Sequence, residues 1–184
     1  MELLIIGMII FYGVHLVPIF SLKKQLINKI GQQPYLGLFS LVSALGLGLM
    51  IYGKGHADII HLFPPIESAH WVPVILMWPA FISLTCTYLP CSMKTTLRHP
   101  MLLGVLIFSA AHVFANGDLA TLLLVGSFGV YSLLTIIFSN NEQIATSKPK
   151  KTLGLNILAI VLGSLVYILA FVFHQHITGM PIPI

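Results

Sequence analysis

Six apolar segments of membrane-spanning length take up most of this chain and restrict what it can fold into. A hydrocarbon core about 30 Å thick is crossed by about 20 apolar residues in a helix. Of the 184 residues, 57% are hydrophobic and 8% are charged, whereas soluble domains carry about 25% charged residues. Six spans and short loops use up this length, which excludes a soluble catalytic, nucleotide-binding or nucleic-acid-binding domain. The apolar segments are residues 3–20, 36–52, 71–89, 101–115, 118–138 and 153–173.

The segments predict an all-α fold, a polytopic membrane helix bundle in which residues 1–184 form a single domain with six transmembrane helices. Helices are required because the backbone must satisfy its own hydrogen bonds in lipid, and the alternating strand pattern of a barrel is absent. The first segment has neither a positively charged n-region nor an Ala-x-Ala site, so we expect it to be retained as a span.

Basic residues are distributed unequally between the two sides of this bundle. Lys54 alone precedes the third span, while the other eight follow the first, third and fifth spans: Lys23, Lys24, Lys29, Lys94, Arg98, Lys148, Lys150 and Lys151. The positive-inside rule therefore predicts cytoplasmic odd-numbered loops and places both termini outside. These loops could also contact anionic lipid, although orientation alone accounts for them.

Two features predict close contacts between spans. The turn Asn116-Gly117-Asp118 is so short that the fourth and fifth spans must form an antiparallel hairpin, with Asp118 as N-cap of the fifth. In the second span Ser40, Ala44 and Gly48 recur every four residues, and we interpret this stripe as a packing surface.

Histidine placement is the most informative feature for function, since the chain has eight histidines against five acidic residues. His15 and His112 lie inside the first and fourth spans, where an ionisable residue is by default a functional candidate. The structural alternative is a neutral imidazole bonded to a neighbouring helix. As a pair on two helices, these residues are suited to hold a haem iron. His174 and His176 make at most a weak metal site.

Depth supports the pairing of these two histidines. At 1.5 Å per residue, His15 lies about 18 Å below the outer start of its span, and His112 about 17 Å above the inner start of its own. In a core about 30 Å thick these levels differ by roughly 5 Å, which helix tilt can cover.

The tripeptide Arg98-His99-Pro100 opens the fourth span. As structure it is a basic interfacial anchor followed by a helix-starting proline. As a binding element, Arg98 and His99 could meet a haem propionate or phosphate through charge-assisted hydrogen bonds. Arg98 lies about 21 Å along the helix from His112, so water or tilt would have to bridge that length.

Several segments together resemble the NnrU family of bacterial membrane proteins. The similar segments are Gly13-Val14-His15, residues 37–43, Pro79-Ala80-Phe81, Tyr88-Leu89-Pro90, residues 97–104, Ala111-His112 and residues 115–119. The resemblance covers residues 5 to 138. It implies a multi-pass protein of the bacterial cytoplasmic (inner) membrane that is linked to denitrification, through nitrite and nitric oxide reductases.

The same family includes 15-cis-zeta-carotene isomerase, a membrane enzyme that uses haem b. Carried over from that enzyme, the resemblance implies His15 and His112 as iron ligands. The position of its alternative cysteine ligand is Ser109 here, which removes a thiolate and disfavours isomerase activity without disfavouring haem. Nitric oxide or a polyene are then the expected ligands, and the catalytic residues are unknown.

Two alternatives stay open. One is a non-catalytic membrane factor that assists assembly or activity of a respiratory reductase, which would be its partner. The other, less favoured, is a membrane methyltransferase, because Arg98-His99-Pro100 with Gly104 also resembles an element of isoprenylcysteine methyltransferases. Those enzymes need acidic residues in a following helix, and after Asp118 the chain offers only Glu142, in a loop.

Overall fold

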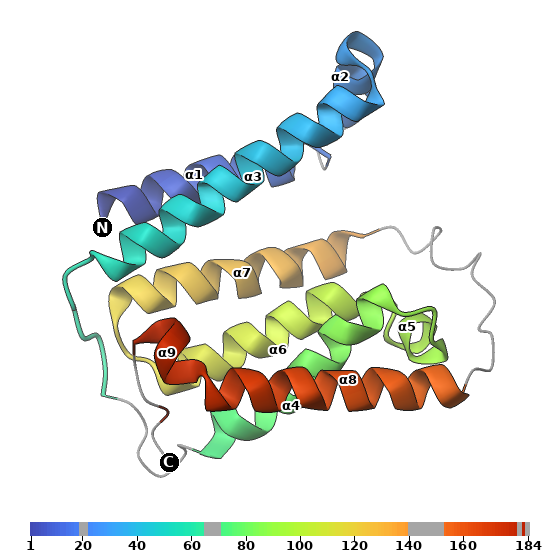
Figure 1. The fold of residues 1–184 in the computed structure, drawn as a ribbon. Helices are drawn as coiled ribbons and strands as arrows, with labels where there is room; N and C mark the ends of the chain where they lie inside the picture. The colour runs from blue at the N-terminus through green and yellow to red at the C-terminus, as the bar shows by residue number, and fades with distance from the viewer. Residues whose placement is uncertain (19–21, 65–70, 140–152, 180–181, 183–184) are drawn as a thin grey trace. The chain divides into compact units, whose positions relative to one another are not determined.

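In the computed structural model, helices make up the regular structure of the described residues, which are 1–18, 22–64, 71–139, 153–179 and 182. Apart from an isolated bridge between His61 and Asp118, this part of the chain has only helical elements (Figure 1). The helices are α1 (Glu2–Leu16), α2 (Leu22–Ile30), α3 (Gln32–Gly55), α4 (Trp71–Tyr88), α5 (Ser92–Leu97), α6 (Pro100–Ala115), α7 (Leu119–Phe138), α8 (Leu153–Val172) and α9 (His174–Thr178).

The all-α prediction is confirmed, and a helix occupies each of the six expected segments. Four helices, α3, α4, α7 and α8, are long and apolar enough to cross a membrane, while α1 and α6 are apolar but shorter. The first helix ends at Leu16, earlier than the expected Phe20. Pro18 has no N–H with which to continue the helical ladder. Phe20 itself and the loop residues Glu142, Lys148, Lys150 and Lys151 lie outside the described residues.

The chain forms two compact units, of which the first comprises Met1–His61 and Asp118–Ala120. Within it, α1 and α3 pack side by side as an antiparallel pair (Figure 1). Gly53 of α3 faces Leu4 of α1, and Gly46 faces Phe11, so residue numbers rise on one helix as they fall on the other. A Cβ on Gly46 would lie 2.8 Å from the backbone nitrogen of Phe11. The two backbones therefore meet at a distance that only glycine permits.

The predicted packing stripe is wrong for this unit. Ser40, Ala44 and Gly48 are exposed, and no described atom lies within 4 Å of a Cβ built on Gly48. The face that packs on α1 instead carries Gly46 and Gly53, seven residues apart. Both stripes have helical spacing, and the spacing of small residues alone does not tell which face of a helix meets its neighbour.

The second unit comprises Leu62–Gly117 and Thr121–Ile184. In it α4 packs against both α6 and α8. A Cβ on Gly163 of α8 would lie 2.7 Å from Cα of Ile82, and two hydrogen bonds add to this contact. The indole of Trp78 donates to the Ser164 hydroxyl over 2.9 Å, and the Tyr167 hydroxyl donates to the Val74 carbonyl over 3.1 Å. These contacts make α4 and α8 antiparallel.

The predicted hairpin of the fourth and fifth spans is confirmed as α6 and α7. Ser109 meets Gly129 near the middle of both helices, and His99 meets Ser139 at the open end. The sum of each pair of residue numbers is constant, as an antiparallel register requires. Asp118 directly precedes α7, at the N-cap position that the sequence predicted.

Large apolar side chains cover the outer surfaces of these helices. On α8, for example, Leu153 is 74% exposed and Val161 55% exposed. In water such a surface would cause aggregation, whereas in a bilayer these side chains contact the hydrocarbon chains of the lipids. The chain is therefore a multi-pass membrane protein whose apolar helices contact the bilayer.

Replacing Gly53 by Ala is expected to weaken the α1–α3 pair, because the added Cβ would collide with the backbone nitrogen of Leu4. Overpacking of this kind costs about 1–3 kcal/mol, and thermal unfolding in detergent measures it. Gly48→Ala on the same helix is the matched control and is expected to keep or slightly raise the midpoint. Equal losses in both variants would contradict the packing argument.

Candidate functional site

His15 lies in the last turn of α1 and is half-buried in the first unit. Its Nδ1 is 2.7 Å from the carbonyl oxygen of Phe11, four residues earlier. The imidazole also stacks on the Phe11 ring, with centroids 4.1 Å apart and planes 25° apart. From α3, the ring of Phe39 approaches to 5.1 Å. Backbone and two aromatic rings thus fix how this imidazole is turned.

His112 repeats this arrangement in the last turn of α6, in the second unit. Its Nδ1 is 3.0 Å from the Phe108 carbonyl oxygen, and its ring lies 4.1 Å from the Phe108 ring. The His112 carbonyl accepts two hydrogen bonds from Asn116, one from the backbone N–H over 3.0 Å and one from the side-chain amide over 2.9 Å. The end of the helix that carries the histidine is therefore capped.

The hydrogen bonds determine which ring nitrogen carries the proton. A carbonyl oxygen only accepts, so Nδ1 of each histidine must be the N–H donor, and in the neutral ring the lone pair then lies on Nε2. Metal-binding histidines have this same second contact, in which the non-ligating N–H is held by a carbonyl. Both residues fit the requirements of an Nε2 ligand to iron.

The arrangement itself arises from local sequence, as His56 at the end of α3 demonstrates. Its Nδ1 lies 2.9 Å from the Tyr52 carbonyl and its ring 4.1 Å from the Tyr52 ring, although both residues are exposed. An aromatic residue four positions before a helical histidine produces the same contacts in all three places. Phe11 and Phe108 therefore support the imidazoles of His15 and His112 directly.

His15 and His112 belong to different units, so each has its own local site. Within the second unit, His174 at the start of α9 is near enough to His112 for its charge to act on that imidazole. Sequence reasoning gave His174 and His176 only a weak role, because two residues that are two positions apart on a helix point to different faces. Among the described residues no group of three or more His, Cys, Asp or Glu side chains is placed to hold a metal ion.

Arg98 lies in a strained turn between α5 and α6. Its φ is 60° and its ψ −55°, and the His99 N–H donates to the Leu97 carbonyl over 2.6 Å. These values describe a γ-turn with positive φ at its centre, the rarer and more strained of the two forms. A non-glycine residue in such a conformation costs about 1–3 kcal/mol, and such strain gathers at functional sites. The Arg98 side chain is exposed.

His99 ties the start of α6 to the end of α7. Its Nε2 lies 2.9 Å from the Ser139 hydroxyl, whose single proton is donated to the Ile136 carbonyl over 3.0 Å. The proton between the two residues must then be on Nε2 of His99, the opposite tautomer to that of His15 and His112. Next in sequence, the buried Pro100 accepts a hydrogen bond over 2.7 Å from Ser83 of α4.

Ser109, at the position of the family's alternative ligand, is buried between α6 and α7. Its hydroxyl donates to the Val125 carbonyl, and its side chain fills the space where Gly129 has no Cβ. The contacts of Ser109 are those of a helix-packing residue. Cys86 and Cys91 are buried free cysteines in the apolar cluster that α4 and α8 share.

The model of the family described as NnrU protein matches residues 3–182. The chain belongs to the NnrU family. The match is longer than the resemblance noted over residues 5 to 138 and takes in α8 and α9 of this NnrU protein. Neither a curated protein nor a solved structure matches the chain.

The strain at Arg98 predicts an unequal effect of two substitutions that both remove its charge. Arg98→Gly relieves the positive φ, whereas Arg98→Gln retains it, so the glycine variant is expected to be the more stable by about 1–2 kcal/mol. Thermal unfolding of the two purified variants measures the difference. Equal stability, or a more stable glutamine variant, would show that the turn is not strained.

Proposed function

We propose that this NnrU protein binds haem b in the membrane, and that His15 and His112 are the residues that would hold its iron. The observation that supports this function most is that the two imidazoles make the same hydrogen bond, each with its own helix. Each is half-buried in an apolar helix and has its Nδ1 N–H on the carbonyl four residues earlier. Each histidine therefore keeps the Nε2 lone pair that a ferrous or ferric iron needs.

The chemistry that a bound haem supplies is reversible electron uptake and the binding of a small ligand at iron. The protein's part is to fix the ligand tautomers, to keep the surroundings apolar and to retain the macrocycle. Nitric oxide and a polyene double bond are the ligands we propose for it, in line with a role in nitrogen-oxide metabolism or isomerase-like chemistry. With serine at position 109, ligation rests on imidazoles alone.

We further propose that Arg98 binds a haem propionate or an equivalent anion. Its exposed side chain lies just before α6, in a turn with positive φ where a glycine would be less strained. Arg98→Gln is then expected to lose haem more readily than the wild type while membrane insertion is unchanged. Unaltered retention of haem would leave Arg98 as an interfacial anchor.

We propose that six helices, α1, α3, α4, α6, α7 and α8, span the bacterial inner membrane with both termini outside. Contacts inside each unit support this topology. Counted in chain order, α1, α4 and α7 are the first, third and fifth spans, and α3, α6 and α8 are the second, fourth and sixth. Each contacting pair, α1–α3, α4–α6, α4–α8 and α6–α7, joins a helix of one set to a helix of the other and is antiparallel, as helices that cross in opposite directions must be. With 15 and 16 residues, α1 and α6 are about 23 Å long, so thinning of the bilayer would accommodate them.

Haem binding is tested by purifying the protein in detergent from haem-replete cells and recording reduced-minus-oxidised spectra. The wild type is expected to carry one haem with the spectrum of a low-spin iron between two imidazoles. His15→Ala and His112→Ala are each expected to lose that spectrum or most of the haem. His56→Ala, which removes a histidine with the same local contacts, is the matched control and is expected to leave it unchanged.

Further variants assign the ligands. Loss of the low-spin spectrum in His174→Ala but not in His15→Ala would make His174 the partner of His112. No stoichiometric haem in the wild type, or spectra unchanged in both principal variants, would overturn the proposal. Co-purification of a reductase with the His15→Ala/His112→Ala double variant would then favour the assembly factor.

The six-span topology is tested with reporter fusions that are active on one side of the membrane only. A periplasmic reporter is expected to be active after Ala57 and after the C-terminus, and a cytoplasmic reporter after Ser139. The two reporters should give opposite signals at every position. The same side for residues 57 and 139 would show that α6, the short helix between them, does not cross, because an even number of crossings would then separate the two positions.

A further inference from the structure

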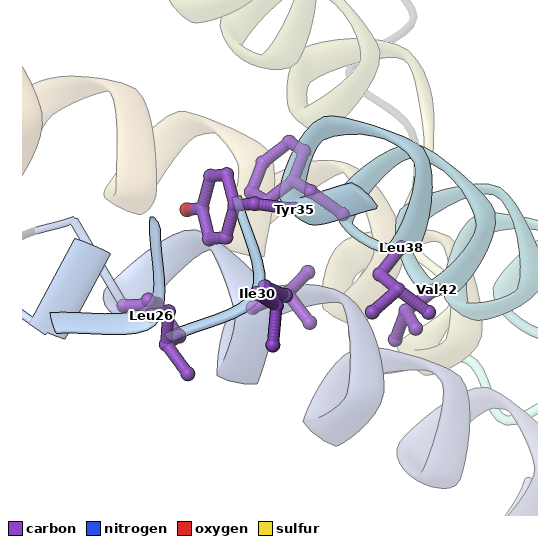
Figure 2. Close-up of a pocket in the computed structure, with 8 residues that line it drawn as sticks. Leu26, Ile30, Tyr35, Leu38 and Val42 are labelled. Atoms are coloured by element: carbon purple, nitrogen blue, oxygen red, sulfur yellow. The ribbon is translucent and has the colours of Figure 1, made fainter. Parts of the chain in front are cut away.

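A small apolar cleft lies inside the first unit, where the end of α1, the helix α2 and the start of α3 meet. Its volume is about 160 Å³. The side chains around it are apolar apart from the hydroxyl of Tyr35, and Figure 2 shows that hydroxyl turned away from Leu38 and Val42. The lining residues are Val14, Val17, Leu26, Ile30, Tyr35, Leu38, Phe39 and Val42.

The shape of the cleft suits one hydrocarbon chain. Its volume is below the roughly 300–1,000 Å³ of sites that hold compact organic ligands. Along α3 the lining runs from Tyr35 to Val42, seven residues and therefore about 10 Å. A macrocycle does not fit into such a slot, whereas several methylene groups of an acyl chain do. Because an acyl chain in lipid is already out of water, its close packing against the cleft walls gives selectivity for shape and not a hydrophobic gain.

Positive charge lies on the helix that forms one wall of the cleft. Lys23, Lys24 and Lys29 of α2 are all exposed, and the sequence has no acidic residue between Glu2 and Asp58. On the helical wheel the apolar residues of α2 form one arc, which includes the cleft-lining Leu26 and Ile30. Lys24 and Lys29 flank this arc, whereas Lys23 lies within it, and its long stem can carry the ammonium group to the polar side.

A basic amphipathic helix of this kind lies at a membrane interface, where lysines near the surface attract anionic lipid. The apolar cleft and the three lysines of α2, which form its cationic rim, therefore lie at the same end of the α1–α3 pair. The combination has the two parts of a phospholipid, an acyl chain and a phosphate with negative charge. The acyl chain of a zwitterionic lipid would also fit the cleft, but its head group has no net charge and would be attracted much less strongly by the three lysines.

We propose that α2 and the cleft form a binding site for one anionic phospholipid. Its acyl chain occupies the slot between Val14, Leu26 and Val42, and its phosphate lies among the ammonium groups of α2. The Tyr35 hydroxyl is the polar group of the slot and faces the ester region of the lipid. Phe39 of the cleft lining also contacts the His15 ring, so the site adjoins one proposed haem ligand, but lipid binding here does not require haem.

The test is native mass spectrometry of the full chain released from nanodiscs of phosphatidylglycerol or of phosphatidylcholine. One phosphatidylglycerol is expected to stay bound, with at least about tenfold higher occupancy than phosphatidylcholine. The Lys23→Gln/Lys24→Gln/Lys29→Gln variant is expected to lose most of this preference. Lys148→Gln/Lys150→Gln/Lys151→Gln removes the same charge from another basic segment and is expected to keep it.

The slot is tested separately by filling it. Val42→Phe is expected to reduce the retained phosphatidylglycerol about tenfold, whereas Val166→Phe, the same change on the exposed surface of α8, is expected to leave it unchanged. If Val42→Phe does not fold, Leu26→Ser on the exposed helix α2 gives the same readout. Equal retention of the two lipids, an unaffected triple-lysine variant, or equal effects of the two phenylalanine variants would each overturn the proposal.

Discussion

Contact between helix backbones at glycine distance is the interaction on which both units depend. In lipid there is no hydrophobic force between apolar helices, so close packing and a few interhelical hydrogen bonds must hold them. Gly53 against Leu4 does this in the first unit, and Gly163 against Ile82 in the second. The bond from Trp78 to Ser164 then fixes the register that the glycine contact permits.

This packing also sets the position of the first candidate ligand. Gly46 of α3 touches the backbone of Phe11, and Phe11 provides both the carbonyl and the ring that hold His15. A side chain at position 46 would therefore displace Phe11 and, with it, the imidazole. Phe39, about two turns before Gly46 along α3, adds the third contact to the ring. The histidine is thus positioned by residues whose own role is helix packing.

The hydrophobic length of the segments made the six long helices predictable, and the two-residue turn made the α6–α7 hairpin predictable. The three short helices α2, α5 and α9 were missed because their sequences are too short or too polar to stand out among spans. The face of α3 that packs on α1 was missed because Ser40, Ala44 and Gly48 have the same helical periodicity as Gly46 and Gly53. Only contact with a partner helix decides between two such faces.

Within the candidate site, the sequence pointed to His15 and His112 through their depth, and the structure adds how they are held. The strained backbone conformation of Arg98 could not be predicted from the sequence, because a γ-turn of this kind depends on how two helices meet and not on the residue at its centre. The same applies to His99, whose partner Ser139 is distant in sequence. Long-range contacts of single polar residues leave no periodic signal for sequence reasoning to detect.

The recurrence of one local arrangement at three histidines separates what is generic from what is specific. His56 has the same carbonyl and ring contacts as His15 and His112, yet it is exposed. In water its N–H can exchange the carbonyl for a solvent molecule at little cost, so either tautomer is accessible. In an apolar helix no such replacement exists, and breaking the bond leaves an unsatisfied donor in lipid. Apolar surroundings therefore hold His15 and His112 in the tautomer with the proton on Nδ1 more firmly than water holds His56.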